Sequence, residues 1–126
     1  MGVRNIWILN DNGIPLYARM TKEVKEDPVL VSGFIYAISA FAKSIIGDEI
    51  KSIKLKKHTF YVKRCGEIIV AILSDVNEEE KMEKLLSKIA EELSGVFRYE
   101  KNSFVVNGNS SRKIKRKIRE ILNNTK

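Results

Sequence analysis

Apolar and polar residues change their spacing along the chain in a way that separates strands from helices. Residues 3–10 contain the apolar run from Ile6 to Leu9, which places apolar side chains on both faces of a strand, and residues 67–74 contain the apolar run from Ile68 to Leu73. A strand with apolar side chains on both faces needs cover on both, so each stretch predicts a central strand. We therefore expect these two strands to lie side by side in the middle of one sheet.

Three further segments have the weaker alternation of edge or half-exposed strands. Residues 14–19 contain Pro15, which cannot donate to a ladder, so this strand is expected at an edge. Residues 50–56 alternate apolar residues with lysines, a pattern that protects an exposed edge. Residues 58–63 alternate as well. Between the first two strands, Asn12-Gly13 predicts a two-residue type I′ turn.

The first helical pattern covers residues 28–46. Asp27 is a candidate N-cap, Pro28 fits the first turn, and Gly47 follows as a C-terminal stop. Half of the helix circumference is apolar, and we expect that half to face the sheet. It consists of Leu30, Val31, Phe34, Ile35, Ile38, Phe41, Ala42, Ile45 and Ile46.

Two more helices are expected in the second half of the chain. One begins near Asn77, which with Glu80 resembles a capping box, and ends at Gly95. Residues 96–106 are expected to form an extended connector, followed by a loop at 107–111. The last helix covers about 112–122 and is amphipathic.

These elements define one α/β domain over residues 1–126, with the order β-β-α-β-β-β-α-α. The predicted sheet has five antiparallel strands in the order 2-1-5-4-3, with helices on both faces. A chain of 126 residues suits a single domain with its own core. Hydrophobic residues make up 44% and charged residues 31%, which excludes a disordered composition.

The outward half of the first helix is small and weakly polar, whereas a helix on a sheet normally turns charges to water. Small residues let another backbone approach closely, so we expect a protein interface here, together with the lysine-rich edge strand. Cover by the last helix or by the 96–106 connector is the alternative. The expected interface residues are Ser32, Gly33, Tyr36, Ser39, Ala40, Lys43, Lys54 and Lys56.

Positive charge is concentrated at the C-terminal end. The formal net charge is +7, yet residues 1–111 hold 16 Lys/Arg against 15 Asp/Glu. The basic helix at about 111–123 can simply turn its charges to water. It can alternatively bind an acidic membrane surface or nucleic-acid phosphates. The candidate anion-binding residues are Arg112, Lys113, Lys115, Arg116, Lys117 and Arg119.

No pattern predicts catalysis, a metal or a cofactor. His58 and Cys65 are the only residues of their types, and they are expected at different strand ends. The acidic cluster at Asp75 and residues 78–80 is explained by the start of a helix, and Asp11 belongs to a turn. The glycines do not have phosphate-loop spacing. We therefore expect a non-enzymatic chain without a cofactor or metal.

The compartment is expected to be the cytoplasm. One cysteine cannot form an internal disulfide, which favours a reducing environment. The longest uncharged apolar stretch, residues 28–42, is shorter than the roughly 18 residues that a membrane span needs.

The order of elements, with ILNDNGIPLYAR and DPVLVSGFIYAISAFAKSI, resembles the longin-like branch of the profilin-like fold, to which roadblock domains are related. The chain lacks the extra first helix of roadblock domains, which favours a longin domain of the stand-alone type found in archaea. The resemblance implies work through protein partners, often a small GTPase or a second copy. We therefore expect a scaffold or regulatory module, with anion binding through the basic helix as the alternative.

Overall fold

A computed structural model describes residues 3–19, 28–75, 78–98 and 108–124. The strands are β1 (Val3–Asn10), β2 (Pro15–Arg19), β3 (Ser52–Lys54), β4 (Thr59–Cys65) and β5 (Ile68–Ser74). The helices are α1 (Pro28–Phe41), continued by a π-helical turn (Ala42–Ile46), α2 (Glu79–Arg98) and α3 (Gly108–Asn124).

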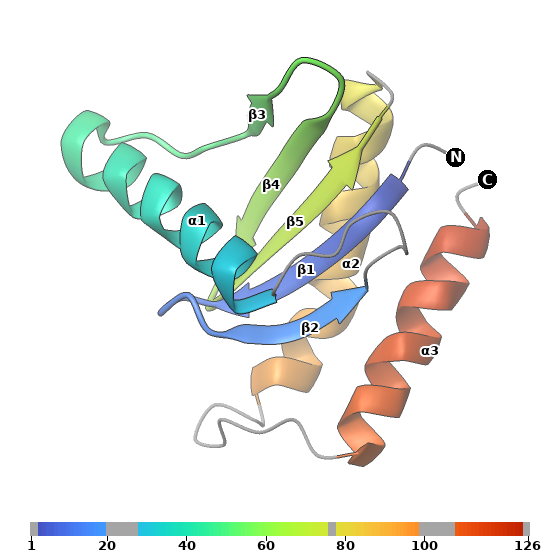
Figure 1. The fold of residues 1–126 in the computed structure, drawn as a ribbon. Helices are drawn as coiled ribbons and strands as arrows, with labels where there is room; N and C mark the ends of the chain where they lie inside the picture. The colour runs from blue at the N-terminus through green and yellow to red at the C-terminus, as the bar shows by residue number, and fades with distance from the viewer. Residues whose placement is uncertain (1–2, 20–27, 76–77, 99–107, 125–126) are drawn as a thin grey trace.

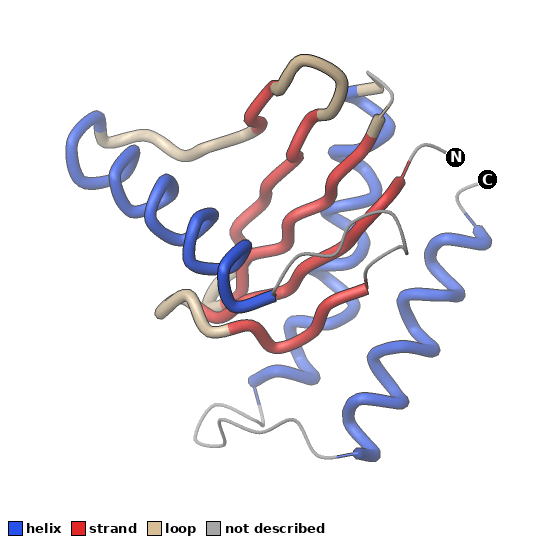
Figure 2. Tube along the Cα trace, in the orientation of Figure 1, coloured by secondary structure: helices blue, strands red, loops and turns tan. Residues whose placement is uncertain are grey.

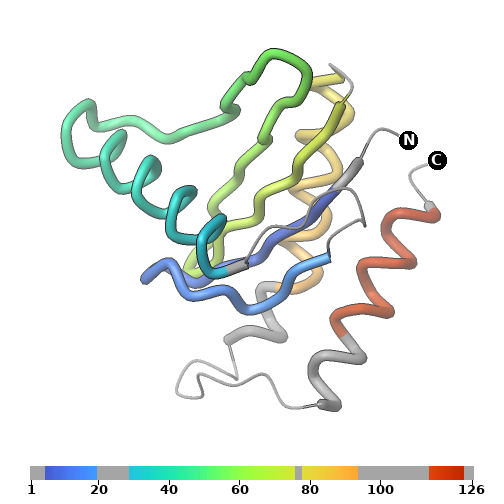
Figure 3. Tube along the Cα trace, viewed as in Figure 1, coloured from blue at the N-terminus to red at the C-terminus, as the bar shows by residue number. Residues whose placement is uncertain are grey.

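The five strands form one sheet in the order β2-β1-β5-β4-β3, and every pair is antiparallel. The predicted order is confirmed. β1 and β5 lie side by side although more than fifty residues separate them in the sequence, as Figure 3 shows. Their adjacency follows from burial, because Ile8 and its partner Val70 are completely inaccessible to water and need neighbours on all sides.

Helices cover both faces of the sheet (Figures 1 and 2). On one face, the apolar sides of α2 and α3 pack with the inward residues of β1 and β5 into the larger core cluster. On the other face, α1 contributes only two apolar residues, Val31 and Ile35, to a smaller cluster around Trp7. The two faces are therefore covered very unequally.

The hairpin between β1 and β2 differs from the predicted two-residue turn. The Asn10 amide donates to the Ile14 carbonyl at 2.9 Å, which closes a three-residue loop. Gly13 has a φ of 84°, and no non-glycine residue in the described part of the chain has a positive φ, so a type I′ turn is excluded. The Asn10 Oδ1 accepts from the amides of Asn12 and Ile14, both at 2.9 Å, and this side chain stabilises the longer loop.

Several predicted boundaries shift. The β3 strand has three residues instead of the seven predicted at 50–56. The α2 helix continues past Gly95 to Arg98, so the first part of the predicted 96–106 connector is helical. The α3 helix begins at Gly108, where a loop was predicted. The predicted caps at Asp27 and Asn77 lie outside the described residues.

Candidate functional site

Only a few residues of α1 are buried against the sheet. In this helix Val31, Ser32 and Ile35 are buried. Beside them, the Phe34 ring lies 6.2 Å from the Phe60 ring of β4, which in turn lies 5.8 Å from Trp7. The Ser32 Oγ is buried without a hydrogen-bond partner in the structure. Apolar and aromatic packing therefore holds the helix here.

The tip of the β1–β2 hairpin supplies a second contact. A Cβ placed on Gly13 would lie 2.8 Å from Cγ and 2.9 Å from Cβ of Tyr36, so the ring of this α1 residue packs directly against the glycine backbone. Only glycine permits this approach together with its positive φ. The contact fixes one side of α1 to the hairpin.

The rest of α1 and the π-helical turn leave several large apolar side chains exposed to water. Leu30 is 67% exposed, Phe41 is 61% exposed, and Ile45 and Ile46 in the π-helical turn are 70% exposed. Phe34 is also exposed despite its contact with Phe60. We call these five residues the apolar row. Single exposed apolar residues are ordinary, but a group on one helix is typical of a docking surface.

The predicted interface is only partly at the surface. Gly33, Tyr36 and Lys43 are exposed, as are Lys54 and Lys56 at the short β3 edge. Ser39 and Ala40 are half-buried. Ser32 is completely buried against the sheet, so the expectation that it faces outward is wrong.

The apolar half of α1, expected to face the sheet, is divided between the sheet and solvent. On a helical wheel, Leu30, Phe34 and Phe41 lie within about 40° of one another. Val31 and Ile35 form a separate stripe beside them, and it is this stripe that is buried. The sequence did contain a sign of the apolar row. Apolar positions cover about half of the helix circumference, which is more than one contact with a sheet can bury.

The helical stretch is also longer than the uncharged segment suggested. The 18 residues from Val29 to Ile46 have a mean hydropathy of 1.8, and 22% of the stretch is buried. By length and composition alone, this helix is able to cross a membrane, which the uncharged stretch at 28–42 did not indicate. Core helices of compact domains have the same composition, so the burial of Val31 and Ile35 on the sheet is the more specific observation.

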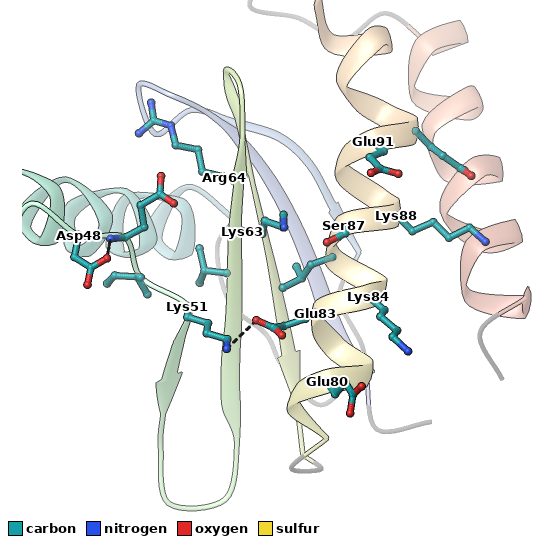
Figure 4. A pocket seen from close by; sticks show the side chains of 15 residues that line it. Asp48, Lys51, Lys63, Arg64, Glu80, Glu83, Lys84, Ser87, Lys88 and Glu91 are labelled. Atoms are coloured by element: carbon teal, nitrogen blue, oxygen red, sulfur yellow. Dashed lines mark hydrogen bonds and ion pairs between the residues drawn. The ribbon is translucent and has the colours of Figure 1, made fainter.

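A groove of about 870 Å³ lies between α2 on one side and residues 48–51 and 62–64 on the other (Figure 4). Ile50, Val62 and Leu86 are its apolar lining residues, and most of the others are charged with both signs. The Lys51 Nζ bridges Glu79 at 3.3 Å and Glu83 at 3.0 Å, and these two carboxylates raise the pKa of the lysine. The walls of the groove therefore consist mainly of exposed charged side chains, some of them in ion pairs.

The candidates for chemistry do not come together. His58 precedes β4 and Cys65 ends it, and seven extended residues span about 23 Å. This distance prevents nucleophile–base contact. Within the described residues, no group of three His, Cys, Asp or Glu is arranged to hold a metal. In the acidic cluster, Glu78 pairs with Lys81 at 3.5 Å and Glu79 with Lys51.

The basic residues of α3 are held on a helix that is part of the core. Lys115, Arg116 and Arg119 are exposed, and Lys117 is half-buried. The side chains of Arg112 and Lys113 lie outside the described part of the structure. The apolar side of α3 is completely or almost completely buried; its members are Ile114, Ile118, Ile121 and Leu122. That stripe is therefore unavailable for insertion into a lipid surface.

Comparison with known proteins agrees with this fold. The model of a family described as the first longin domain of FUZ, MON1 and HPS1 matches residues 4–123. The structure is similar to a roadblock/LC7 domain from Streptomyces avermitilis, with a TM-score of 0.58 and 11% identity over 78% of this chain and 88% of that one. It is also similar to Myxococcus xanthus MglB, with a TM-score of 0.52 and 16% identity over 77% and 85%. No curated protein sequence matches the chain.

Proposed function

The chain belongs to the longin family represented by the first longin domains of FUZ, MON1 and HPS1, and from this premise we propose that it is a non-catalytic protein-docking module. Its contact surface is the apolar row of α1, extended by the lysines at the short β3 edge. The partner is a second copy of the chain or a small GTPase. The cytoplasm is the compartment in which we expect it to act.

The observation that carries this proposal is the exposure of the apolar row. Burying apolar area stabilises a complex by about 25 cal/mol per Å², and five large side chains on one helix supply such area. The sheet contact and the Tyr36–Gly13 contact hold the row in one orientation. Because the row already has this orientation before binding, little further ordering is needed when a partner binds, which favours affinity.

The first test is the double substitution Leu30→Glu with Phe41→Glu, at the start and in the middle of the apolar row. Both side chains are largely exposed, so the fold is expected to persist by circular dichroism. If a second copy is the partner, sedimentation equilibrium of the full chain gives a dimer. The double variant should then raise its dissociation constant at least ~10-fold, about 1.4 kcal/mol.

If a small GTPase is the partner, a photo-crosslinking amino acid at position 41 should capture a GTP-binding protein in cells. The same amino acid at the exposed Lys84 of α2 is the matched control. A monomeric chain whose position 41 captures nothing beyond this control would contradict the proposal. Flotation of the purified chain with lipid vesicles, abolished by the double variant, would identify the row as a membrane surface instead.

A further inference from the structure

A second surface lies around β2, at the opposite edge of the sheet from β3 (Figure 1). In the five-stranded sheet, β2 is outermost and pairs only with β1. Each of its five residues is at least partly exposed, in contrast to the fully buried β5. An outermost strand presents backbone N–H and C=O groups that can pair with another extended chain.

Cations from two elements converge on this strand. Arg19, the last residue of β2, and Arg119 of α3 both lie close enough to the Tyr17 hydroxyl to favour its ionised form. Burial is the larger effect and leaves the pKa of Tyr17 raised. Lys115 lies one helical turn before Arg119 and on the same side of α3. The tyrosine thus marks the place where the basic side of α3 meets the sheet edge.

The ion pairs that the structure shows between described residues lie elsewhere, at Lys51 and Lys81. None of these pairs neutralises Arg19, Lys115, Arg116 or Arg119. Since Arg19 and Arg119 both act on the Tyr17 hydroxyl, an anion bound near this hydroxyl would be attracted by both. A second copy would bring the same cations to the same edge, so self-pairing through β2 is opposed.

The helix that carries the cations is fixed. Ile114 and Ile118, in the apolar stripe next to these cations, are no more than 1% exposed. Because this apolar side packs in the core, α3 cannot turn it toward lipid. Nucleic-acid phosphates fit the cations but bring no peptide groups to the open edge. An acidic chain in extended conformation satisfies both the backbone and the arginines.

We propose that the β2 edge, with Arg19, Lys115, Arg116 and Arg119, docks an acidic extended segment of another protein, which adds a sixth strand next to β2. Pro15 and the register shift that skips Leu16 protect the beginning of β2, so pairing is expected along Tyr17–Arg19. This surface goes beyond the proposed function, because it lies at a different edge from the apolar row and selects a partner by charge.

The experiment measures fluorescence anisotropy of three labelled eight-residue peptides with the full chain. The first peptide alternates Glu with Thr, which places every carboxylate on one side of an extended strand. The second has Gln for Glu, and the third has Pro for Thr, which removes half of the backbone donors. We expect the Glu–Thr peptide to bind most tightly, and its affinity to fall as salt rises.

The double variant Arg19→Gln with Arg119→Gln should weaken the Glu–Thr peptide at least ~10-fold, about 1.4 kcal/mol. The matched control, Lys84→Gln with Lys88→Gln, removes two exposed cations of α2 and should leave its affinity within about 2-fold. Backbone amide shifts that change along Tyr17–Arg19, and not along β3, would locate the added strand.

Four results would overturn the proposal. They are equal binding of the Gln–Thr peptide, equal binding of the Glu–Pro peptide, no binding of the Glu–Thr peptide at millimolar concentration, and equal loss in the Lys84/Lys88 control. Single-stranded DNA or phosphatidylserine vesicles that bind more tightly than the peptide, through the same arginines, would also overturn it. Such binding would identify a general polyanion surface.

Discussion

At the scale of single residues, position 13 is the one at which the structure most strictly requires glycine. Its φ of 84° is a conformation that L side chains rarely adopt, and Tyr36 occupies the space of a Cβ. Gly13→Ala should therefore lower the free energy of unfolding by about 1–3 kcal/mol. Urea denaturation followed by circular dichroism measures this change.

Gly33 is the matched control for that substitution. It lies in α1 with nothing within 4 Å of its hypothetical Cβ. Gly33→Ala should therefore raise the free energy of unfolding by about 0.5–1 kcal/mol, because alanine is the better helix former. Equal effects of the two substitutions would contradict the role given to the Tyr36 contact.

Tyr17 provides a titration at the same scale. Burial raises its pKa above 10.0, and Arg119 opposes this rise. Arg119→Gln should therefore raise the pKa of Tyr17 further, which NMR titration of the tyrosine ring carbons would detect. An unchanged or lower pKa in the variant would show that Arg119 does not act on the phenol.

The same group makes stability depend on alkaline pH. The unfolded chain releases the tyrosine proton near pH 10, whereas the folded chain retains it to a higher pH. The contribution of Tyr17 is therefore complete below pH 10 and is lost as pH rises through the folded pKa.

The hairpin shows how far residue patterns predict a turn. Asn-Gly correctly predicted a turn with glycine at positive φ. The predicted number of loop residues was wrong, because the Asn10 side chain accepts hydrogen bonds from two backbone amides and stabilises a longer loop. This competing acceptor lies outside the Asn-Gly pair, so the pair alone cannot reveal it.

At the scale of elements, α3 is part of the core. Ile118 is 1% exposed and packs with residues of β1, β5 and α2. Ile118→Ala should lower the free energy of unfolding by about 2–5 kcal/mol, whereas Arg116→Gln on the exposed side should change it by less than about 0.5 kcal/mol. Thermal and urea unfolding of both variants would check this. A mild effect of Ile118→Ala would mean that α3 is dispensable for folding.

The orientation of α1 could not be derived from its sequence. Two apolar stripes lie beside each other on this helix. A helical wheel alone does not tell which of the two faces the sheet. The aromatic pair of Phe34 and Phe60 and the position of Tyr36 over Gly13 decide the rotation. Both contacts join segments that are distant in the sequence, which periodicity within one helix does not encode.

At the scale of the whole molecule, the strand order was predictable because burial is encoded locally. The apolar runs of β1 and β5 require a central place, while Pro15 and the lysines near β3 require edges. The two surfaces were less predictable. The apolar row depends on the rotation of α1, and the basic surface at β2 depends on Arg19 and Arg119, one hundred residues apart, meeting at Tyr17.

The small contact between α1 and the sheet has a consequence for the lifetime of the protein. A helix that buries only three residues against its sheet opens at a lower free-energy cost than one embedded in the core. Each opening bares the aromatic cluster around Trp7 and offers α1 to proteases and chaperones. Under the proposed function, a partner bound to the apolar row would stabilise the closed position of α1, and the chain without its partner would be expected to be degraded faster than the complex.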